Sequence, residues 1–293
     1  MPDEKSSSPS VCIVVPVYRS ALPPREAMSL AQCTRVLGHY PIAFVKPQSL
    51  NIDPLLKRCP GARVESFEDE FFRGVDGYNR LMLSDPFYGR FSTHEFMLIH
   101  QLDAYVFADE LAHWCSQSFD YLGAPWITRE RIEFPSKAFL LKQRLYQMLD
   151  VRNRDDGFLH RAQYGYIGGN GGFSLRRISR MREALAQCAA QLPAYRQRAH
   201  HTHNEDVFFC VEANRRKTLI RLAPFRVALQ FSWETHPAVA RALMPGRLPF
   251  GCHGWDRHYQ GTWTEIFRSI GIDLPVVEAE TGTGDELKIT GAT

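Results

Sequence analysis

The 293-residue sequence has little excess charge and no long apolar run, and each shortage excludes a class of protein. The 35 Lys and Arg residues stand against 32 Asp and Glu residues, a net charge of +3, which is too balanced for a chain that binds nucleic acid through bulk charge. The uninterrupted apolar runs span only a few residues, so no membrane-crossing helix is expected. The polar N-terminus has no apolar core of a signal peptide, and we expect a chain that is not secreted.

Cysteine is sparse and irregularly placed. There are seven cysteines, an odd number, and no two of them form a CxxC motif. Several lie inside apolar periodic segments, where a free cysteine behaves as a small hydrophobic residue. The sequence therefore predicts reduced thiols in a cytoplasmic protein.

The pattern of apolar runs predicts a mixed α/β fold. Residues 11–15 form an apolar run of strand length that Pro16 closes, residues 23–37 have helical spacing, and residues 41–45 form a second apolar run. A strand, a helix and a strand within this length make a βαβ unit, which implies a parallel sheet. Further strands are predicted at 62–67, 95–103, 119–127, 172–175, 219–222 and 225–231, and further helices at 178–192 and 204–216.

The chain reads as one domain without internal repeats. We expect a disordered lead-in over residues 1–10, a domain over 11–274 and a loose tail over 275–293, where Glu, Thr and Gly dominate. Residues 128–163 interrupt the alternation of strands and helices with a basic amphipathic helix at 137–152. Its apolar positions include Leu141 and Leu145, and its bases include Lys142.

A glycine-dense segment at 168–172 has neither the GxGxxG spacing of a dinucleotide site nor the spacing of a P-loop. Four glycines in five positions allow the backbone to approach a ligand closely, and they also suit a plain tight turn. Asn170 among the glycines favours a site that faces a sugar.

Asp103 follows the strand predicted at 95–103, together with Gln101. Ligands of open α/β sheets bind outside the carboxyl ends of the strands, so both residues stand where chemistry is expected. A buried aspartate needs a hydrogen bond, an ion pair or a cation, and a divalent ion with a diphosphate is one such partner. A turn or cap aspartate is the alternative.

The segment Asn204-Glu205-Asp206 precedes an apolar run. Asn204 suits a helix N-cap, and acids are stabilised in a first helical turn, so capping is one interpretation and acid–base chemistry the other. Two further groups of residues are ambiguous. His200, His201 and His203 with Glu205 suggest a metal-dependent hydrolase or a polar loop, and Trp233, Trp255, Trp263 and Tyr259 suggest a carbohydrate-stacking wall or an aromatic core.

Several motifs in this order resemble a bacterial nucleotide-sugar glycosyltransferase-like family of the GT-A fold, of poorly defined specificity. The resemblance covers about residues 11–256. Its motifs are Val14-Val15-Pro16-Val17-Tyr18, Gly77-Tyr78-Asn79-Arg80-Leu81, Gln101-Leu102-Asp103-Ala104, Gly123-Ala124-Pro125-Trp126, Gly169-Asn170-Gly171-Gly172-Phe173-Ser174 and Asn204-Glu205-Asp206-Val207-Phe208-Phe209.

The resemblance implies a single GT-A-like domain with a Rossmann-like, mostly parallel sheet and a helical insertion. It also implies a metal site for Mn²⁺ or Mg²⁺, in which Asp103 is the first aspartate of an Asp-x-Asp motif and His253 completes the set. Tyr105 stands where the second aspartate would be, and one carboxylate with a histidine holds a metal more weakly than two carboxylates. Arg19 or Arg80 would then neutralise part of the diphosphate.

By the same resemblance, Asp206 corresponds to the general base of inverting members, with Glu205 as second choice. The implied donor-binding residues are Pro16, Tyr18, Arg19, Arg80, Gln101 and Asp103. The implied acceptor-side residues are Asn170, Gly171, Gly172, Trp126 and Trp255.

The expected activity is transfer of a sugar from a nucleotide-diphospho-sugar to a hydroxyl of a glycan or lipid-linked glycan, in polysaccharide biosynthesis. The expected location is the cytoplasm, including the inner face of a membrane, which the helix at 137–152 would contact unless it is simply solvated. The missing second aspartate motivates an alternative, a non-catalytic module that binds a nucleotide sugar or glycan. A metal-dependent hydrolase is a third hypothesis.

Overall fold

The computed structural model describes residues 10–128, 132–197 and 200–275. The expected lead-in and tail lie almost wholly outside the described residues. Within these ranges, no helix combines the length and the apolar character that crossing a bilayer requires. All seven cysteines are free, and all but Cys188 are buried, as expected of small hydrophobic residues.

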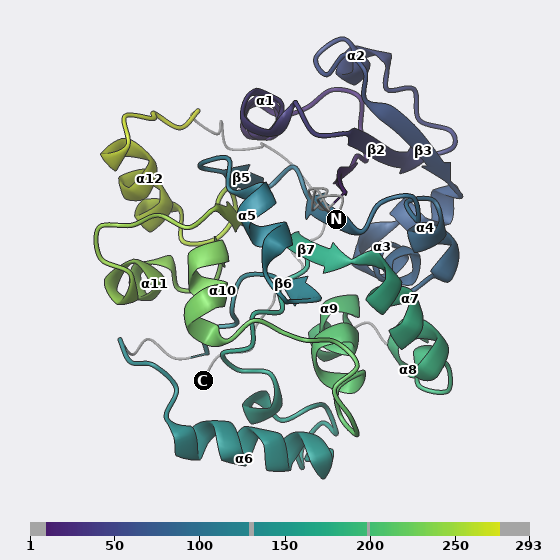
Figure 1. Ribbon diagram of the computed structural model, residues 1–293. Helices are drawn as coiled ribbons and strands as arrows, with labels where there is room; N and C mark the ends of the chain where they lie inside the picture. The colour runs from purple at the N-terminus through teal and green to yellow at the C-terminus, as the bar shows by residue number, and fades with distance from the viewer. Residues whose placement is uncertain (1–9, 129–131, 198–199, 276–293) are drawn as a thin grey trace, which may run out of the picture.

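A six-stranded sheet forms the centre of the molecule, in the order β3-β2-β1-β4-β7-β6 (Figure 1). The strands β3, β2, β1 and β4 are parallel, whereas β7 runs antiparallel to β4 and to β6. Their bounds are Arg63–Phe67 (β3), Ile42–Pro47 (β2), Val11–Pro16 (β1), Phe96–His100 (β4), Phe173–Arg177 (β7) and Tyr121–Leu122 (β6). The predicted mixed α/β fold with a mostly parallel sheet is confirmed.

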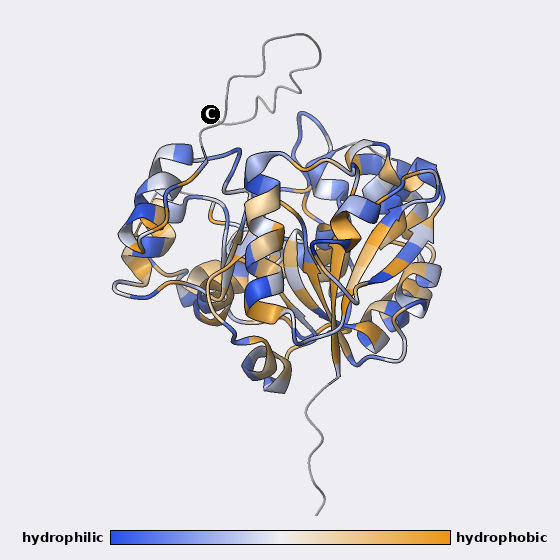
Figure 2. Cartoon of the chain, turned by 90° about the horizontal axis from the view of Figure 1, so that it is seen from above, coloured by the Kyte–Doolittle hydropathy of each residue, from blue (hydrophilic) through white to orange (hydrophobic). Residues whose placement is uncertain are grey.

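Helices cover both faces of this sheet. Alternate residues of β1 enter two cores: Ile13 packs with α1, and Val14 packs with α3. Figure 2 shows the orange strands of the sheet between helices that carry blue, hydrophilic residues. The helices are α1 (Pro24–Leu37), α2 (Asp53–Leu56), α3 (Gly74–Met82), α4 (Asp85–Gly89), α5 (Leu111–Ser116), α6 (Lys137–Met148), α7 (Ile178–Gln187), α8 (Leu192–Gln197), α9 (Glu205–Val207), α10 (Phe225–Phe231), α11 (Pro237–Leu243) and α12 (Gln260–Ser269).

A second, three-stranded sheet was not anticipated from the sequence. It has the order β5-β9-β8, with β5 at Ala104–Val106, β9 at Gly251–His253 and β8 at Ser232–Trp233. The antiparallel pairing of β5 with β9 sets Ala104 opposite His253. Parallel pairing of β8 with β9 sets Trp233 opposite Cys252. Three distant stretches of chain therefore meet beside the carboxyl end of β4.

The predicted strand at 225–231 is wrong, because these residues form helix α10. Pro224 precedes the helix, and Phe225, Ala228 and Leu229 share its buried face. A short apolar run fits either a strand or a buried helix, so the spacing could not separate the two. The predicted strand at 219–222 is also absent, and Leu222 forms only an isolated bridge with Tyr121.

Other predicted elements are present but shorter. The strand expected at 119–127 is reduced to Tyr121–Leu122, and the helix expected at 178–192 is α7 followed by the separate α8. The helix expected at 204–216 is a single α-turn, α9, which continues into a π-helical turn at Phe208–Glu212. The helix expected in the insertion is α6, along the lower edge of Figure 1.

Candidate active site

A cavity of about 540 Å³ opens at the carboxyl ends of β1 and β4. It collects most of the residues that the sequence singled out. Those that line it are Pro16, Tyr18, Arg19, Gln101, Asp103, Asn170, Gly171, Gly172, Glu205, Asp206 and His253. The register of β4 with the antiparallel β7 pairs His100 with Phe173, which explains why the turn before β7 reaches this edge of the sheet.

Three of the proposed site residues lie elsewhere. Arg80 on α3 points its guanidinium at the carbonyl of Glu70, at 3.4 Å. Trp126 packs its ring over Gly169 and against the core. Trp255 has no exposed surface and packs against Tyr105 and Phe267, so it is a core residue and not a sugar platform.

The stacking-wall interpretation fails for the other tryptophans as well. Trp233 and Trp263 are fully buried in the same aromatic cluster as Trp255. A ring that stacks on a sugar needs one open face, which none of the three has. The aromatic-core alternative is correct for these tryptophans.

His253 stands between two carboxylates. Its Nδ1 lies 2.9 Å from Oε1 of Glu234, and its Nε2 lies 3.1 Å from Oδ1 of Asp103 and 3.1 Å from Oε1 of Gln101. Burial favours the neutral ring, but Asp103 and Glu234 outweigh it and raise the pKa of His253 well above its usual value. Burial likewise opposes the Asp103 carboxylate, yet His253 and then Arg257 lower the pKa of Asp103 to about 2.

The donor atoms around His253 fit a divalent cation. Glu234 holds the Nδ1 side of the ring, so Nε2 faces the carboxylate of Asp103 and the amide oxygen of Gln101. An imidazole nitrogen with a carboxylate and an amide oxygen can hold a divalent transition-metal ion such as Mn²⁺ once Nε2 of His253 has lost its proton. Within the described ranges, no group of three or more His, Cys, Asp or Glu side chains converges on one point.

Tyr105 takes no part in this set. It is buried in β5, and its ring contacts Phe107, Trp255 and Phe267 on the opposite side of the strand from the cavity. Arg257 is the nearest unpredicted cation, with Nη2 3.8 Å from Oδ2 of Asp103. Arg19 lines the cavity too, and its guanidinium lies 3.5 Å from Glu26.

The glycines of the 168–172 segment are explained by close contacts. None of them has a positive φ, so a left-handed turn is not the reason for their presence. A Cβ on Gly172 would lie 2.0 Å from Nε2 of His253, and one on Gly171 would lie 2.4 Å from Oε1 of Glu205. Gly171 and Gly172 therefore make room for the side chains of Glu205 and His253.

Glu205 forms an ion pair with Arg176. The guanidinium donates Nη2–H to Oε1 at 2.8 Å and Nη1–H to Oε2 at 2.9 Å, and both side chains are buried. Burial opposes the charge on Arg176, but Glu205 raises the pKa of Arg176 well above its usual value. Both oxygens of Glu205 are thus occupied, which leaves it poorly placed to accept a proton from a substrate.

Asp206 is half-buried at the cavity wall. One of its oxygens accepts the backbone N–H of Val207 at 2.8 Å. Burial, and then the nearby charge of Glu205, raises the pKa of Asp206 well above its usual value. The sequence suggested the opposite direction, because a helix start lowers the pKa of an acid. A raised pKa makes the deprotonated carboxylate of Asp206 a stronger base.

The start of α9 is capped from another helix. Asn204 makes no side-chain cap; its Oδ1 accepts from the amide of Asn79 at 3.0 Å. Oδ1 of Asn79 in turn accepts the backbone N–H of Glu205 at 3.2 Å. The Asn79 side chain thereby ties α3 to the acid pair, a role that the motif around it did not reveal.

The histidine cluster does not form a metal centre with Glu205. His200 stacks on Phe158 with ring centroids 3.5 Å apart, and its Nδ1 lies 2.8 Å from the hydroxyl of Thr202. His203 packs its ring against Tyr195. Because Arg176 binds both oxygens of Glu205, this carboxylate is not available as a metal ligand beside the histidines. The metal-dependent hydrolase hypothesis is therefore not supported.

Sequence reasoning missed Arg176, Glu234 and Arg257. Arg176 lies in an apolar strand next to a second arginine, Glu234 follows a two-residue strand, and Arg257 follows a loop. None of them carries a spacing signal. Only their proximity to Glu205, His253 and Asp103 identifies them.

Comparison with solved structures finds similar chain traces at low identity. Mouse xyloside xylosyltransferase 1 is 11% identical, with a TM-score of 0.46, over 84% of this chain and 97% of the other. The galactosyltransferase LgtC, solved with donor and acceptor sugar analogues, is 12% identical, with a TM-score of 0.48, over 92% and 98%. Core-mannan synthase A from Aspergillus fumigatus, in an Mn/GDP form, is 11% identical, with a TM-score of 0.44, over 71% and 72%.

No curated protein sequence matches the chain. A family model described as "Protein of unknown function (DUF5672)" matches residues 61–253. That range runs from the start of β3 to the end of β9 and includes Asp103, the glycine segment, Asp206 and His253. It is more than half of the sequence, and the chain therefore belongs to the DUF5672 family.

Proposed function

We propose that the protein is a glycosyltransferase that moves a sugar from a nucleotide-diphospho-sugar to a hydroxyl of a glycan or lipid-linked glycan. One observation carries the proposal. A single cavity at the carboxyl ends of parallel strands holds Asp103 in contact with His253, which we propose as cation ligands, and also an acid with a raised pKa, Asp206. Glycosyl transfer needs both, since a diphosphate leaves while an acceptor hydroxyl loses a proton.

Asp206 is the general base in this proposal. Its carboxylate takes the proton from the acceptor hydroxyl as the oxygen forms its bond to the anomeric carbon, and the bond from that carbon to the diphosphate oxygen breaks. The hydroxyl attacks the anomeric carbon from the face opposite the leaving diphosphate, through an oxocarbenium-like state, so this single displacement inverts the configuration. Burial and then the neighbouring Glu205, which pairs with Arg176, raise the pKa of Asp206.

Asp103, His253 and Gln101 form the donor end. These residues would hold a divalent cation, which would supply positive charge to the diphosphate as its negative charge grows. Arg257 and Arg19, both at the cavity, add guanidinium donors that suit phosphate oxygens. The backbone of Gly171 and Gly172 and the amide of Asn170 lie between the two ends, where the sugar would sit.

A non-catalytic binding module is the second candidate. The buried Tyr105 in place of a second aspartate favours it, because a single carboxylate holds a metal less firmly. The two candidates share the same cavity, and they differ in whether Asp206 turns over a substrate. We do not propose the hydrolase, because Glu205 pairs with Arg176 and not with the histidines.

A thermal-shift panel of nucleoside diphosphates and nucleotide sugars, each with and without Mn²⁺, tests the site. A ligand at a hundred times its dissociation constant should stabilise the fold by about 2.7 kcal/mol. A hit that needs Mn²⁺ and disappears in Asp103→Asn but not in the exposed Asp53→Asn would support the donor site. A hit without hydrolysis or transfer would favour the binding module, and no hit across the panel would count against both.

A further inference from the structure

Helix α6 presents its apolar side to solvent. The exposed fractions are 74% for Leu141, 51% for Leu145, 61% for Met148 and 66% for Leu149. With a helical repeat of about 3.6 residues, these side chains lie along one stripe of the helix. Ala138, one turn before Leu141, is exposed on the same side. A helix of a globular protein ordinarily turns such a stripe toward the core.

The side of α6 that faces the protein carries two glutamines together with Phe139, whose ring contacts Tyr166. Gln143 and Gln147 are buried, and each donates its amide N–H to a backbone carbonyl at 2.7 Å, that of Gly165 and that of Gln163 respectively. Ser136 caps the start of the helix by accepting the N–H of Phe139. Specific hydrogen bonds therefore hold α6 with its apolar stripe outward, and rotating the helix would leave those carbonyls unpaired.

Basic residues flank the stripe on both sides. Lys137 and Arg144 lie along one edge of the stripe and Lys142 along the other, and the helix contains no Asp or Glu. Arg144 donates to the carbonyl of Asn214, and the Lys142 ammonium lies 5.0 Å from the Tyr146 ring centroid. An apolar stripe with basic residues at both edges is typical of a helix that lies in the plane of a membrane surface.

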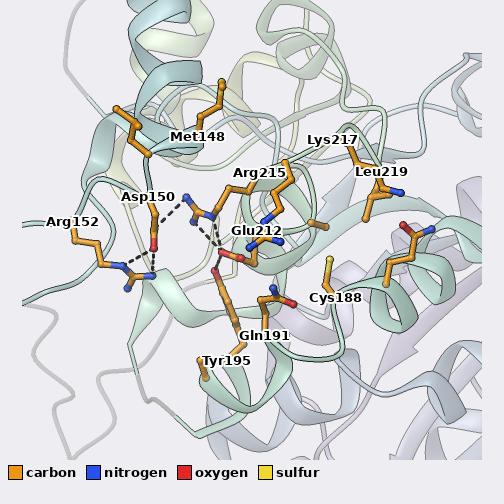
Figure 3. A pocket seen from close by; sticks show the side chains of 15 residues that line it. Met148, Asp150, Arg152, Cys188, Gln191, Tyr195, Glu212, Arg215, Lys217 and Leu219 are labelled. Atoms are coloured by element: carbon orange, nitrogen blue, oxygen red, sulfur yellow. Dashed lines mark hydrogen bonds and ion pairs between the residues drawn. The ribbon is translucent and has the colours of Figure 1, made fainter.

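A basic pocket of about 510 Å³ continues this surface beyond the end of α6 (Figure 3). Met148 and Leu149 line it, together with Arg216 and Lys217. Arg216 and Lys217 are exposed, and within the described residues neither makes a hydrogen bond or an ion pair.

The acids of that pocket are already paired. Asp150 accepts from Arg152 at 3.0 Å and lies 3.1 Å from Arg215, and Glu212 accepts from Arg215 and from Tyr195. Figure 3 shows these contacts as one network beneath the pocket. The charge left over at the surface is therefore positive.

We propose that α6 and the rim of this pocket bind the surface of an anionic lipid bilayer. The apolar stripe enters the headgroup–acyl boundary, and Lys137, Lys142, Arg216 and Lys217 meet lipid phosphates. A second copy of the chain is a poorer occupant, because a two-fold contact through α6 would set these bases against one another without an acid on the helix to pair them.

The bilayer surface also has a structural link to the cavity. The carbonyls that hold α6 belong to residues 163–165, and the chain runs directly from there into the 168–172 segment that lines the cavity. Bilayer binding does not depend on the proposed function, since it requires no catalysis at Asp206.

Flotation of the full chain with lipid vesicles tests the proposal. We expect binding to vesicles of phosphatidylcholine mixed with phosphatidylglycerol, weaker binding as salt rises, and little binding to phosphatidylcholine alone. Leu141→Gln with Leu145→Gln should weaken binding more than about tenfold. Arg216→Gln with Lys217→Gln should weaken it roughly 30-fold, since each base near an anionic surface contributes about 1 kcal/mol.

Matched variants elsewhere on the surface are the controls. Val64→Gln with Ile270→Gln removes two exposed apolar side chains, and Lys57→Gln with Arg58→Gln removes two exposed bases. These variants should bind as the wild type does, and circular dichroism checks that all variants fold. The proposal is overturned if the wild type does not float with anionic vesicles, or if the α6 and control variants lose binding equally. It is also overturned if light scattering finds a dimer that the Leu141 and Leu145 substitutions dissociate while vesicle binding is absent.

Discussion

The guanidinium of Arg176 and the carboxylate of Glu205 form a two-point ion pair beneath the cavity, with N–O distances of 2.8 and 2.9 Å. Arg176 also donates to the carbonyl of Gly171 and to the hydroxyls of Tyr88 and Ser174. One side chain thus joins β7, the glycine segment and the start of α9. The pair occupies both oxygens of Glu205, whereas Asp206 accepts the backbone N–H of Val207, so the two neighbouring acids have different partners.

Arg176→Met should destabilise the protein by about 3–5 kcal/mol, because it leaves the Glu205 carboxylate buried without a partner. Urea unfolding measures the change. Arg182→Met is the control, since it breaks an exposed pair with Asp85 and should cost less than about 1 kcal/mol. Equal losses of unfolding free energy in the two variants would mean that the buried pair stabilises the fold no more than the exposed pair does.

Gly172→Ala should disturb the donor end of the cavity, because the added Cβ would overlap Nε2 of His253. We expect a loss of about 1–3 kcal/mol in unfolding free energy and a loss of Mn²⁺-dependent ligand binding. Gly89→Ala is matched to it, since a Cβ there meets nothing within 4 Å. A Gly172→Ala protein with wild-type stability and binding would contradict the close approach seen here.

Asp206→Asn should lower turnover by about 10²–10⁴-fold and leave binding of the donor nucleotide intact, because the amide cannot accept the acceptor proton. Steady-state kinetics with the donor found in the thermal-shift panel measures it. Asp206 is not the base if turnover stays within about threefold of the wild type. Asp53→Asn, at an exposed helix start, controls for loss of one carboxylate.

The raised pKa of Asp206 has opposite consequences for stability and for turnover. Because burial and Glu205 raise the folded-state pKa above the unfolded value, the folded chain binds this proton more tightly. That stability is present below the unfolded pKa, near 3.9, and is lost as pH rises through the folded pKa. Asp206→Asn should therefore be more stable than the wild type at neutral pH and show a flatter dependence of unfolding free energy on pH.

The turnover rate of the wild type should fall as pH is lowered, with a midpoint above the usual pKa range of an aspartate. The reason is that the base acts only when it has lost its proton. A pH–rate profile measures this midpoint. If the pH dependences of turnover and of unfolding free energy both indicate an ordinary aspartate pKa for Asp206, then Glu205 does not raise the pKa of Asp206 as proposed.

Glu234→Gln should weaken Mn²⁺ binding about 10–100-fold, because Glu234 orients the His253 ring through Nδ1. Calorimetric titration with Mn²⁺ measures the affinity. Glu265→Gln, at an exposed position of α12, should leave it unchanged. Unchanged Mn²⁺ affinity in Glu234→Gln would show that Mn²⁺ binding does not depend on the contact between Glu234 and the His253 ring.

Much of the central sheet was predictable from local pattern. Apolar runs closed by polar residues define β1, β2 and β4, because strands buried on both faces need continuous apolar sequence. The end of β4 then marks Asp103, and the acids before an apolar run mark Asp206. Short apolar runs carried less information, and Phe225–Phe231 satisfied the strand pattern while forming a helix.

The chemistry around these residues came from pairings that no local pattern contains. His253 meets Asp103 only because β9 pairs with β5, and Glu205 meets Arg176 only because α9 packs behind β7. Both contacts join residues far apart in the chain, so their energies depend on the folded arrangement and leave no spacing signal.

The sequence by itself determined that the chain builds a mostly parallel α/β domain, that Asp103 and Asp206 stand at element ends, and that an amphipathic helix begins at Lys137, although it ends at Met148 and not at residue 152. Only the tertiary structure decided which face of that helix is covered. Periodicity tells that Leu141 and Leu145 lie opposite Gln143, but not which side meets the protein. The carbonyls of Gly165 and Gln163 decide it, because they bind the glutamines and leave the leucines outside.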